Sequence, residues 1–570
     1  MVRTVGIGMQ DFSKVIENNC FYVDKTAFLK EWWESRDDVT LITRPRRFGK
    51  TLLMSMVEQF FSVEYLDRRE LFEQLSIWSE ENYRSLQGTY PVISLSFADV
   101  KETDFINTRA KICRIITDLY NKYDFLLESG CLNENEKADY RRISEEISDP
   151  ALSYALKALS LYLSRYYGKK VIILLDEYDT PMQEAYVNGY WGEMVSFIRN
   201  LFNATFKTNP YLERAIMTGI TRISRESVFS DLNNMTVITT MSNQYADSLG
   251  FTEEEVYAAL KEYGLEERME DVRYWYDGFR FGQHRDIYNP WSILNYLKTG
   301  RLAAYWANTS SNVLIGKLIR EGSANVKIIM EDLLEGKTFH ARIDEQIVFD
   351  QLGRKESAIW SLLLASGYLR VEKLWESDRK AGTEYDLMLT NQEVAFMFRQ
   401  MIEEWFAEFT PAYNAFIRAL LLGDKKAMNT YMNRVAMATF SYFDTGRSPS
   451  AHAEPERFYH GFVLGLLVDL ADRYKITSNR ESGFGRYDIM LEPRDIKESS
   501  AKEHFNRDAI IIEFKVRDPE DENSLEDTAE AALRQIEERQ YATALKEGGF
   551  AAERIRCYGF AFEGKKVLIQ

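Results

Sequence analysis

The stretch TRPRRFGKT, residues 43–51, follows a short apolar run and precedes a segment whose apolar residues recur at helical spacing. A strand, a loop and a helix in that order are the context that a phosphate-binding loop requires. In such a loop Gly49 lets the backbone approach the anion, Lys50 reaches the phosphates, and the hydroxyl of Thr51 binds Mg²⁺. The sequence therefore predicts an α/β domain built around a phosphate loop.

This loop departs from the usual pattern G-x-x-x-x-G-K-[ST] at its first position. Arg44 stands where the first glycine is expected, and Pro45 after it removes one backbone N–H donor and fixes φ. Taken alone, the loop supports nucleotide binding and an ordinary turn about equally, so the remaining sequence has to decide between them.

A second signal lies at the end of the apolar run 171–175. That run has the character of a central parallel strand and ends in the acidic turn 176–179. Because open α/β sheets bind ligands at the carboxyl ends of their strands, we expect these acids beside the loop. Asp176 would bind Mg²⁺ through its water shell, and Glu177 would orient or deprotonate the water attacking a γ-phosphate. An acidic turn without function is the alternative, and the pairing of the two signals favours a nucleotide site.

Other residues are weaker candidates for the same site. Arg222 or Arg225, after a strand expected over 214–218, would supply positive charge to the transition state, although loop arginines are more often solvated. Phe21 or Tyr22 would stack on a base, but packing against the sheet is the preferred interpretation. The aromatic stretches 275–279 and 289–291 could also touch nucleotide, and packing is again preferred.

The composition limits the class of protein. With 570 residues, 45% of them hydrophobic and 28% charged, the chain is long enough for several globular domains. A formal charge of -17 argues against a wholly basic nucleic-acid coat but leaves a local positive groove open. The cysteines and histidines lack disulfide or zinc spacing, and no apolar stretch is long enough to span a bilayer. We therefore expect a cytoplasmic protein with reduced thiols and no membrane segment.

The middle of the chain reads mostly as helices. Thr252 with Glu255 has the pattern of a capping box, and Asn289-Pro290 is a cap followed by proline at the first helical position. The expected domains are a phosphate-loop domain at 1–249, a helical lid at 250–355, a winged-helix-like connection at 356–443 that holds DNA or merely joins domains, and, after a linker at 444–455, a last domain at 456–570.

A second set of chemical residues lies near the C-terminal end. A glycine-containing turn delivers Asp488 onto a strand, and the period of two in the strand 509–516 places Glu513 and Lys515 on one face. Charges in so apolar a strand are costly unless they are paired or metal-bound. Asp488 and Glu513 can hold Mg²⁺ or Mn²⁺, while Lys515 positions the attacking water or offsets phosphate charge. The pattern favours metal-assisted phosphodiester hydrolysis over an edge strand with solvated charges.

Four stretches together resemble the bacterial AAA-ATPase-like family: GIGMQDF (6–12), YVDKT (22–26), RPRRFGKT (44–51) and LDEYD (175–179). The resemblance implies an AAA-type P-loop fold with ATP as its ligand, and a C-terminal PD-(D/E)XK nuclease-like domain, which such proteins typically carry. The residues we expect to contact the nucleotide or its Mg²⁺ are Arg46, Arg47, Phe48, Gly49, Lys50, Thr51 and Asp176.

The C-terminal segment is similar to the PD-(D/E)XK nuclease family residue by residue. Asp488 matches the first acid of that family, and Glu513 with Lys515 matches its E-x-K; Tyr487 replaces the usual proline before the first acid. The resemblance further implies that Glu456 is a metal-proximal acid and that Gln535 is a polar helper.

The expected fold class is α/β, with an AAA-type P-loop parallel sheet domain, a helical and winged-helix-like middle region and a C-terminal restriction-endonuclease-like α/β domain. We expect an ATP-binding, ATP-hydrolysing protein that is coupled to an Mg²⁺- or Mn²⁺-dependent nuclease acting on nucleic acid, DNA ahead of RNA, with oligomer formation left open. The alternative is a nucleotide-dependent switch or binding module whose nuclease fold is catalytically inactive.

Overall fold

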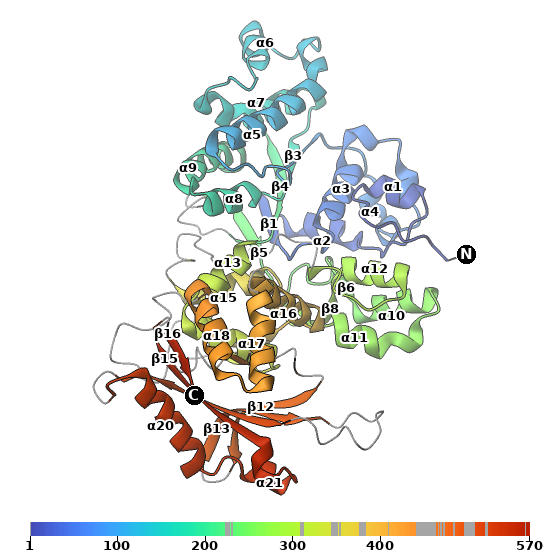
Figure 1. Ribbon diagram of the computed structural model, residues 1–570. Coiled ribbons are helices and arrows are strands. Elements are labelled where there is room, and N and C mark those ends of the chain that lie inside the picture. The colour runs from blue at the N-terminus through green and yellow to red at the C-terminus, as the bar shows by residue number, and fades with distance from the viewer. Residues whose placement is uncertain are drawn as a thin grey trace. The chain divides into compact units, whose positions relative to one another are not determined.

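Figure 1 shows the computed structural model of the chain. It describes residues 2–222, 229, 232–307, 313–343, 352, 355–375, 384–407, 410–439, 463, 464, 467, 470, 473–482, 485–494, 508–518, 522–564 and 566–570. The chain forms two compact units, the first comprising Met1–Leu318 with Gly336–Phe398 and the second Ile319–Glu335 with Arg399–Gln570. The expected linker at 444–455 lies outside the described residues.

The first unit is built on a five-stranded parallel sheet with the strand order β2-β3-β4-β1-β5. Strands β1 and β3 are buried along their whole lengths, as their continuous apolar sequences predict. Because β1 and β3 both pair with β4 in parallel, the carboxyl ends of all three strands meet at one edge of the sheet. The strands are β1 (Val39–Thr43), β2 (Val92–Ser96), β3 (Val171–Asp176), β4 (Leu212–Gly219) and β5 (Met235–Ile238).

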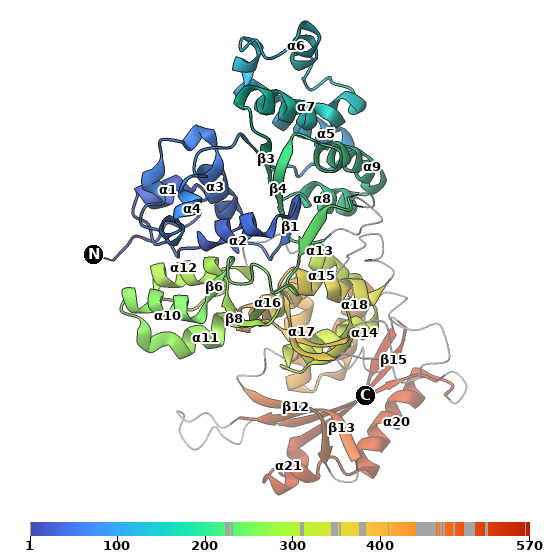
Figure 2. The same cartoon turned by 180° about the vertical axis from the view of Figure 1, so that it is seen from behind.

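Helices cover both faces of this sheet. Apolar side chains of α1, α2 and α3 pack against Ile42, Ile172 and Ile216 on one face. Figures 1 and 2 show α5 and α7 to α9 on the other side of the sheet. The helices are α1 (Phe12–Glu17), α2 (Ala27–Ser35), α3 (Lys50–Phe61), α4 (Glu81–Arg84), α5 (Phe105–Lys122), α6 (Glu134–Arg141), α7 (Asp149–Tyr167), α8 (Thr180–Asn188) and α9 (Trp191–Phe202).

Residues 251–299, the first part of the predicted lid and the part called the lid region below, combine three helices with a small sheet that the sequence did not predict. The capping box of Thr252 and Glu255 is present, and the side chain of Asn289 accepts from the N–H of Trp291 at the start of α12, so both predicted caps are confirmed. The sheet has the order β6-β8-β7, and its strands are short. The elements are β6 (Phe251–Thr252), α10 (Glu253–Glu262), α11 (Met269–Tyr276), β7 (Phe279–Phe281), β8 (His284–Tyr288) and α12 (Pro290–Thr299).

A three-stranded antiparallel sheet with the order β10-β11-β9 follows in the chain. The helix α15, the strands β10 and β11 and the helix α16 lie in the region predicted to be a winged-helix-like connection. The elements are α13 (Val313–Glu321), α14 (Ala324–Leu334), β9 (Phe339–Arg342), α15 (Glu356–Ala365), β10 (Leu369–Trp375), β11 (Glu384–Leu389) and α16 (Gln392–Ala407).

A buried carboxylate ties the start of α16 to the lid. Glu393 is fully buried and accepts hydrogen bonds from the hydroxyl of Ser292 on α12 at 2.8 Å and from the backbone N–H of Trp306 at 2.5 Å. Burial raises the pKa of Glu393 from its ordinary value of 4.5 to about 7, because the charged form is poorly solvated there.

The stability of the first unit is therefore expected to depend on the protonation of Glu393. The folded state binds the proton more tightly than the unfolded chain, so this contribution is complete below about pH 4.5 and is lost, by roughly 3 kcal/mol, as the pH rises toward 7. Glu393→Gln mimics the protonated acid and should lose this dependence. The free energy of unfolding in urea should be higher for the variant than for the wild type at pH 8, relative to their difference at pH 5. An equal difference between the two proteins at both pH values would contradict the prediction.

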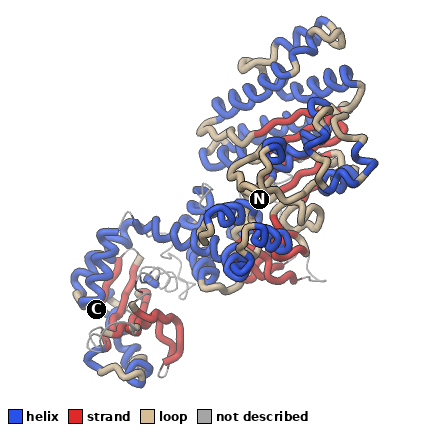
Figure 3. Tube along the Cα trace, turned by 90° about the vertical axis from the view of Figure 1, so that its right-hand side faces the viewer, coloured by secondary structure: helices blue, strands red, loops and turns tan. Residues whose placement is uncertain are grey.

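The second unit contains a five-stranded mixed sheet with the order β12-β13-β14-β15-β16, in which β14 and β15 are parallel. Figure 3 shows strands and helices side by side in this unit, near the C-terminus. Apolar residues of α17 and α18 pack on one face of this sheet, and α20 with α21 covers the other. The elements are α17 (Thr410–Leu422), α18 (Lys425–Thr439), β12 (Tyr474–Ser482), β13 (Gly485–Pro493), β14 (Ala509–Val516), α20 (Leu525–Glu538), α21 (Thr543–Glu547), β15 (Ile555–Glu563) and β16 (Lys566–Ile569).

Candidate functional site

The predicted phosphate loop joins β1 to α3. Gly49 precedes the first helical residue with φ of 86°, a left-handed conformation that favours glycine. The first N–H groups of a helix have no partner within the helix and carry its positive partial charge. The loop therefore presents backbone donors in the geometry that suits an anion.

Lys50 and Thr51 lie at the start of α3 and connect the loop to its surroundings. The ammonium group of Lys50 is buried and donates to the carbonyl oxygens of Arg44 at 2.9 Å and Pro45 at 2.8 Å. The hydroxyl of Thr51 donates to Asp176 Oδ2 at 2.7 Å. The structure thus brings together the loop and the acidic strand end, as the sequence predicted.

Asp176 is buried among hydroxyl groups. Its other carboxylate oxygen accepts a short hydrogen bond from Thr218, the residue near the end of the intervening strand β4. Burial raises the pKa of Asp176 and lowers the pKa of Lys50, because each group loses hydration in its charged form. A hydroxyl and a carboxylate oxygen are ligands that Mg²⁺ prefers, so Thr51 and Asp176 fit a bound magnesium ion.

Glu177 follows β3 in a left-handed backbone conformation, with φ of 51°. Such a conformation is unfavourable for a residue with a side chain and is kept only where the surroundings hold it. Its N–H donates to the hydroxyl of Thr218 at 3.3 Å, and its carboxylate accepts from the hydroxyl of Thr180 at 3.2 Å. The backbone therefore fixes this acid next to Asp176 at the end of the strand.

Asp179 is a structural residue that the sequence interpretation missed. It is buried, and its carboxylate accepts from the N–H groups of Ile220 and Thr221 and from the hydroxyl of Thr221, at 2.8–3.0 Å. These bonds hold the chain that leaves β4, where Gly219 has no room for a side chain against Tyr178 and Asp179. The only signal in the sequence was a second aspartate three residues after Asp176.

Arg44 has a structural role at the position where the usual pattern has its first glycine. Its side chain is fully buried, donates to the carbonyl oxygens of Thr43 and Thr239, and lies 4.4 Å from the ring centroid of Phe281. Burial lowers the pKa of Arg44 to about 9. The arginine at this position therefore holds the base of the loop to the chain after β5.

The other loop residues point in different directions. The guanidinium group of Arg46 donates to the side-chain oxygen of Gln183 on α8 at 3.5 Å. The guanidinium group of Arg47 stacks over the ring of Trp291. Phe48 was predicted to contact nucleotide, but its side chain is buried in the first unit, against Phe279 and Phe281, so any such contact is left to its backbone.

The weaker candidates divide in the same way. Phe21 packs edge to face with Phe251 and Tyr263, which confirms packing as its role in the fold. Arg222 lines a cavity of about 20 Å³ together with Thr43 at the end of β1. Arg225 lies outside the described residues.

The predicted nuclease residues meet on the sheet of the second unit. Strands β13 and β14 are antiparallel with Ile489 opposite Ile512, which brings Asp488 to Glu513. The N–H of Asp488 donates to Glu513 Oε2 at 3.3 Å, and the N–H of Phe514 donates to Asp488 Oδ2 at 2.8 Å. The two carboxylates therefore share one end of this strand pair.

Gln535 reaches the same pair from α20. Its amide nitrogen donates a short hydrogen bond to Glu513, a side chain that is only 2% exposed. The same nitrogen lies 3.2 Å from the hydroxyl oxygen of Tyr541. On β14, Ile512 and Phe514 belong to the core on the α17 and α18 side, so Glu513 and Lys515 lie on the opposite face, as the period of two predicts.

These groups suit a hard divalent cation in their chemistry, since carboxylate oxygens are the ligands that Mg²⁺ and Mn²⁺ favour. Within the described part of the chain, no group of three or more histidine, cysteine or acidic side chains could hold a metal ion, and Asp488 with Glu513 makes a pair. Glu456, the predicted third acid, lies outside the described residues.

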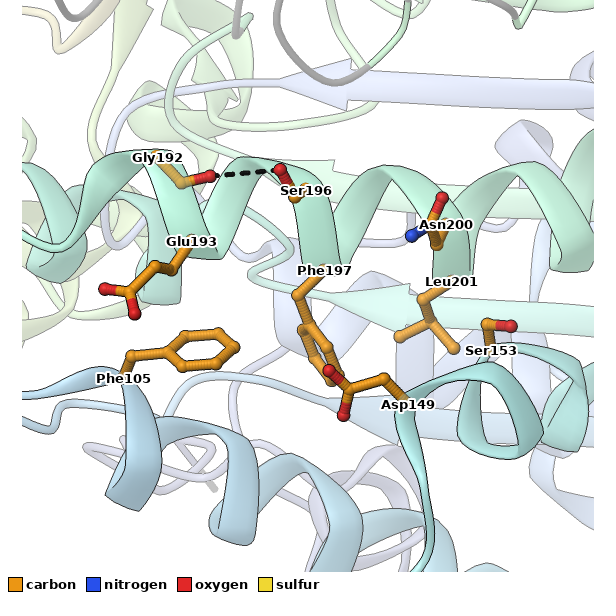
Figure 4. A pocket seen from close by; sticks show the side chains of 9 residues that line it. All are labelled: Phe105, Asp149, Ser153, Gly192, Glu193, Ser196, Phe197, Asn200 and Leu201. Carbon is orange, nitrogen blue, oxygen red and sulfur yellow. Dashed lines mark hydrogen bonds between the residues drawn. The ribbon is translucent and has the colours of Figure 1, made fainter.

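A cavity of about 390 Å³ lies elsewhere in the first unit, between α5, α7 and α9. Figure 4 shows the rings of Phe105 and Phe197 and the carboxylates of Glu193 and Asp149 around it. Asp149 is paired with Arg109, and the lining includes none of the predicted site residues. The cavity is therefore separate from the phosphate loop.

Comparison with known proteins gives two family matches. Residues 6–229 match the family model of a predicted AAA-ATPase, and residues 454–570 match that of the PD-(D/E)XK nuclease superfamily. These matches confirm the two resemblances and the α/β fold class predicted from the sequence. None of the helices in the described ranges is long and apolar enough to cross a membrane.

One curated relative comes from Azotobacter chroococcum mcd 1 and is described as an uncharacterized protein in the vnfD 5′ region. It is 26% identical over 326 residues, a region that makes up 56% of this chain and 57% of the relative. The chain therefore spans little more than half of that relative's length.

Proposed function

We propose that the chain binds and hydrolyses ATP at the phosphate loop and carries a metal-dependent nuclease site in its C-terminal unit. The observation that carries the ATP site is the hydrogen bond between Thr51 and Asp176, which joins the loop to the acidic strand end across β4. The match of residues 6–229 to a predicted AAA-ATPase supports the same conclusion.

In this proposal Lys50 leaves the carbonyl groups of the loop to bind the β- and γ-phosphates, and the loop N–H groups bind the phosphate oxygens. Thr51 and Asp176 would hold Mg²⁺, which neutralises charge on the phosphates. Glu177 orients or deprotonates the attacking water. Burial deprives the charged forms of Lys50 and Asp176 of hydration. A phosphate beside Lys50 and a magnesium ion beside Asp176 would offset this cost, which favours binding of a magnesium–nucleotide complex.

The nuclease proposal rests on the paired carboxylates. Asp488 and Glu513 would hold Mg²⁺ or Mn²⁺, which stabilises negative charge on a phosphodiester, and Lys515 would position the attacking water. Gln535 positions Glu513 through its amide. We propose nucleic acid as the substrate, with DNA ahead of RNA, and the cytoplasm as the place of action.

Titration with a fluorescent ATP analogue tests the nucleotide site. Lys50→Ala should weaken binding by about 100-fold, because two charge-assisted hydrogen bonds to phosphate are lost, each worth roughly 1.5 kcal/mol. Thr51→Val keeps the shape of its side chain and should weaken binding only in the presence of Mg²⁺.

Lys122→Ala, at the far end of α5, is the matched control and should bind as the wild type does. Circular dichroism checks that Lys50→Ala still folds, since the lysine also donates to two carbonyl groups. Unchanged binding in a folded Lys50→Ala protein would refute the loop assignment.

A further inference from the structure

The phosphate loop is held from outside the parallel sheet. Its residues 45–48 contact β7, the start of α12 and the segment before β10, all of which belong to the first unit. Figures 1 and 2 both show the group α10 to α12 beside α1, α2 and α4. The contacts come from Asn289 and Trp291 at the start of α12, from the aromatic residues of β7 and from Gly367.

Asn289 bridges the loop and the lid with one side chain. It is fully buried, its Oδ1 accepts from the N–H of Trp291 at 2.9 Å, and its Nδ2 donates to the carbonyl oxygen of Arg46 at 3.2 Å. An N-cap needs only the first of these bonds. The second bond fixes the backbone of the loop at Arg46.

Trp291 holds the next residue of the loop. The guanidinium carbon of Arg47 lies 4.4 Å from the centroid of the Trp291 ring, within the range of a cation–π interaction. Arg47 has φ of 65°, which is unfavourable for any residue other than glycine and persists only where contacts hold it. The stacking on Trp291 is one contact that holds this side chain.

Pro45 is fixed in a similar way. Gly367, after α15, has φ of 84°, and a Cβ there would lie 2.7 Å from Cγ of Pro45. The absence of a side chain at Gly367 therefore lets the loop pack closely against this part of the first unit.

We propose that Asn289 and Trp291 are positioning residues of the nucleotide site, which keep residues 45–48 in the conformation that receives phosphate. This inference rests on the proposed nucleotide function. If the loop loses these contacts it samples other conformations, and the measured affinity falls in proportion to the population of the competent one. The chemical groups at Asp176 and Glu177 are untouched, so turnover by the bound state should not change.

The experiment is a double-mutant cycle on the full chain, with KM and kcat for ATP as the readouts. Trp291→Leu and Arg47→Ala, which keeps the unfavourable backbone conformation, should each raise KM about threefold, the value of an exposed cation–π pair, and leave kcat within twofold. The double variant should be no worse than either single one, because both remove the same contact. Trp291→Phe keeps an aromatic face and should recover most of the affinity.

Asn289→Ser separates capping from positioning. Serine still caps α12 but is too short to donate to Arg46, so KM should rise while the midpoint of thermal unfolding stays near that of the wild type. Additive effects in the cycle, a fall in kcat alone, or normal KM in Trp291→Leu would each overturn the inference.

The two proposals fail in different ways. If the wild type and Lys50→Ala bind nucleotide equally weakly, the nucleotide function itself is wrong and the positioning role falls with it. If Lys50→Ala loses binding while Trp291→Leu and Asn289→Ser keep it, only the positioning role is wrong.

Discussion

Replacing Glu513 by glutamine is expected to reduce metal-dependent cleavage of plasmid DNA by about 1,000-fold. A metal ion at a phosphodiester supplies several kcal/mol of charge stabilisation in the transition state, and each 1.36 kcal/mol corresponds to a factor of ten in rate. Glutamine has the same size and keeps one oxygen that can accept from Gln535, but its amide nitrogen cannot accept from the N–H of Asp488. The variant therefore loses the charge that would hold the metal together with this one hydrogen bond.

The stability of the same variant provides a second measurement. Glu513 is 2% exposed, and a buried carboxylate is costly without a cation. Added Mg²⁺ or Mn²⁺ should raise the unfolding midpoint of the wild type but not that of the variant.

Glu537→Gln, on α20, is the matched control and should cleave DNA at the wild-type rate. Cleavage that survives in Glu513→Gln would contradict the nuclease assignment. Metal-dependent stabilisation of the wild type without any cleavage would instead favour a nuclease fold that binds and does not turn over.

Patterns that are local in the sequence predicted much of this structure. The strand β1, the loop and α3 follow one another within 23 residues, Val39 to Phe61. A continuous apolar run in the sequence predicts the buried strand β3. The period of two in β14 gave Glu513 and Lys515 the correct face. These features depend on neighbouring residues, so a single sequence is enough to recognise them.

Residues whose role depends on distant partners could not be predicted. The carbonyl groups that bind Arg44 belong in part to Thr239 and Tyr245, 195 and 201 positions along the chain. Asn289 reads as a helix cap, and nothing nearby indicates that its amide reaches Arg46 243 positions away. The small sheet of β6, β7 and β8 was missed because its strands are too short to show an alternating pattern.

The order of the strands in the sheet also could not be predicted from local sequence patterns. The site residues lie at or just after the ends of β3 and β1, and β4 lies between these two strands. Asp176 therefore accepts a hydrogen bond from Thr218 of β4 as well as from Thr51. Thr218 lies near the carboxyl end of this intervening strand. Its hydrogen bond to Asp176 follows from the parallel register of β3 and β4, in which Leu175 is opposite Met217.

Replacing Glu177 by glutamine should leave ATP bound but lower the rate of hydrolysis by roughly 100-fold to 1,000-fold. General base catalysis by a positioned side chain contributes about this much, and the amide cannot accept a proton at neutral pH. The backbone at Glu177 is held in its unfavourable conformation by the N–H bond to Thr218, which the substitution does not touch. The amide oxygen can also still accept from Thr180.

Release of inorganic phosphate under single-turnover conditions measures the effect, and titration with the fluorescent analogue measures the affinity in parallel. Glu184→Gln, on α8, controls for the loss of one negative charge near the site. A Glu177→Gln protein that hydrolyses ATP at the wild-type rate would exclude Glu177 as the base, whereas loss of binding would assign it to the nucleotide pocket instead. Normal affinity with slow release is the combination that only a catalytic carboxylate produces, because the loop and its lysine remain intact.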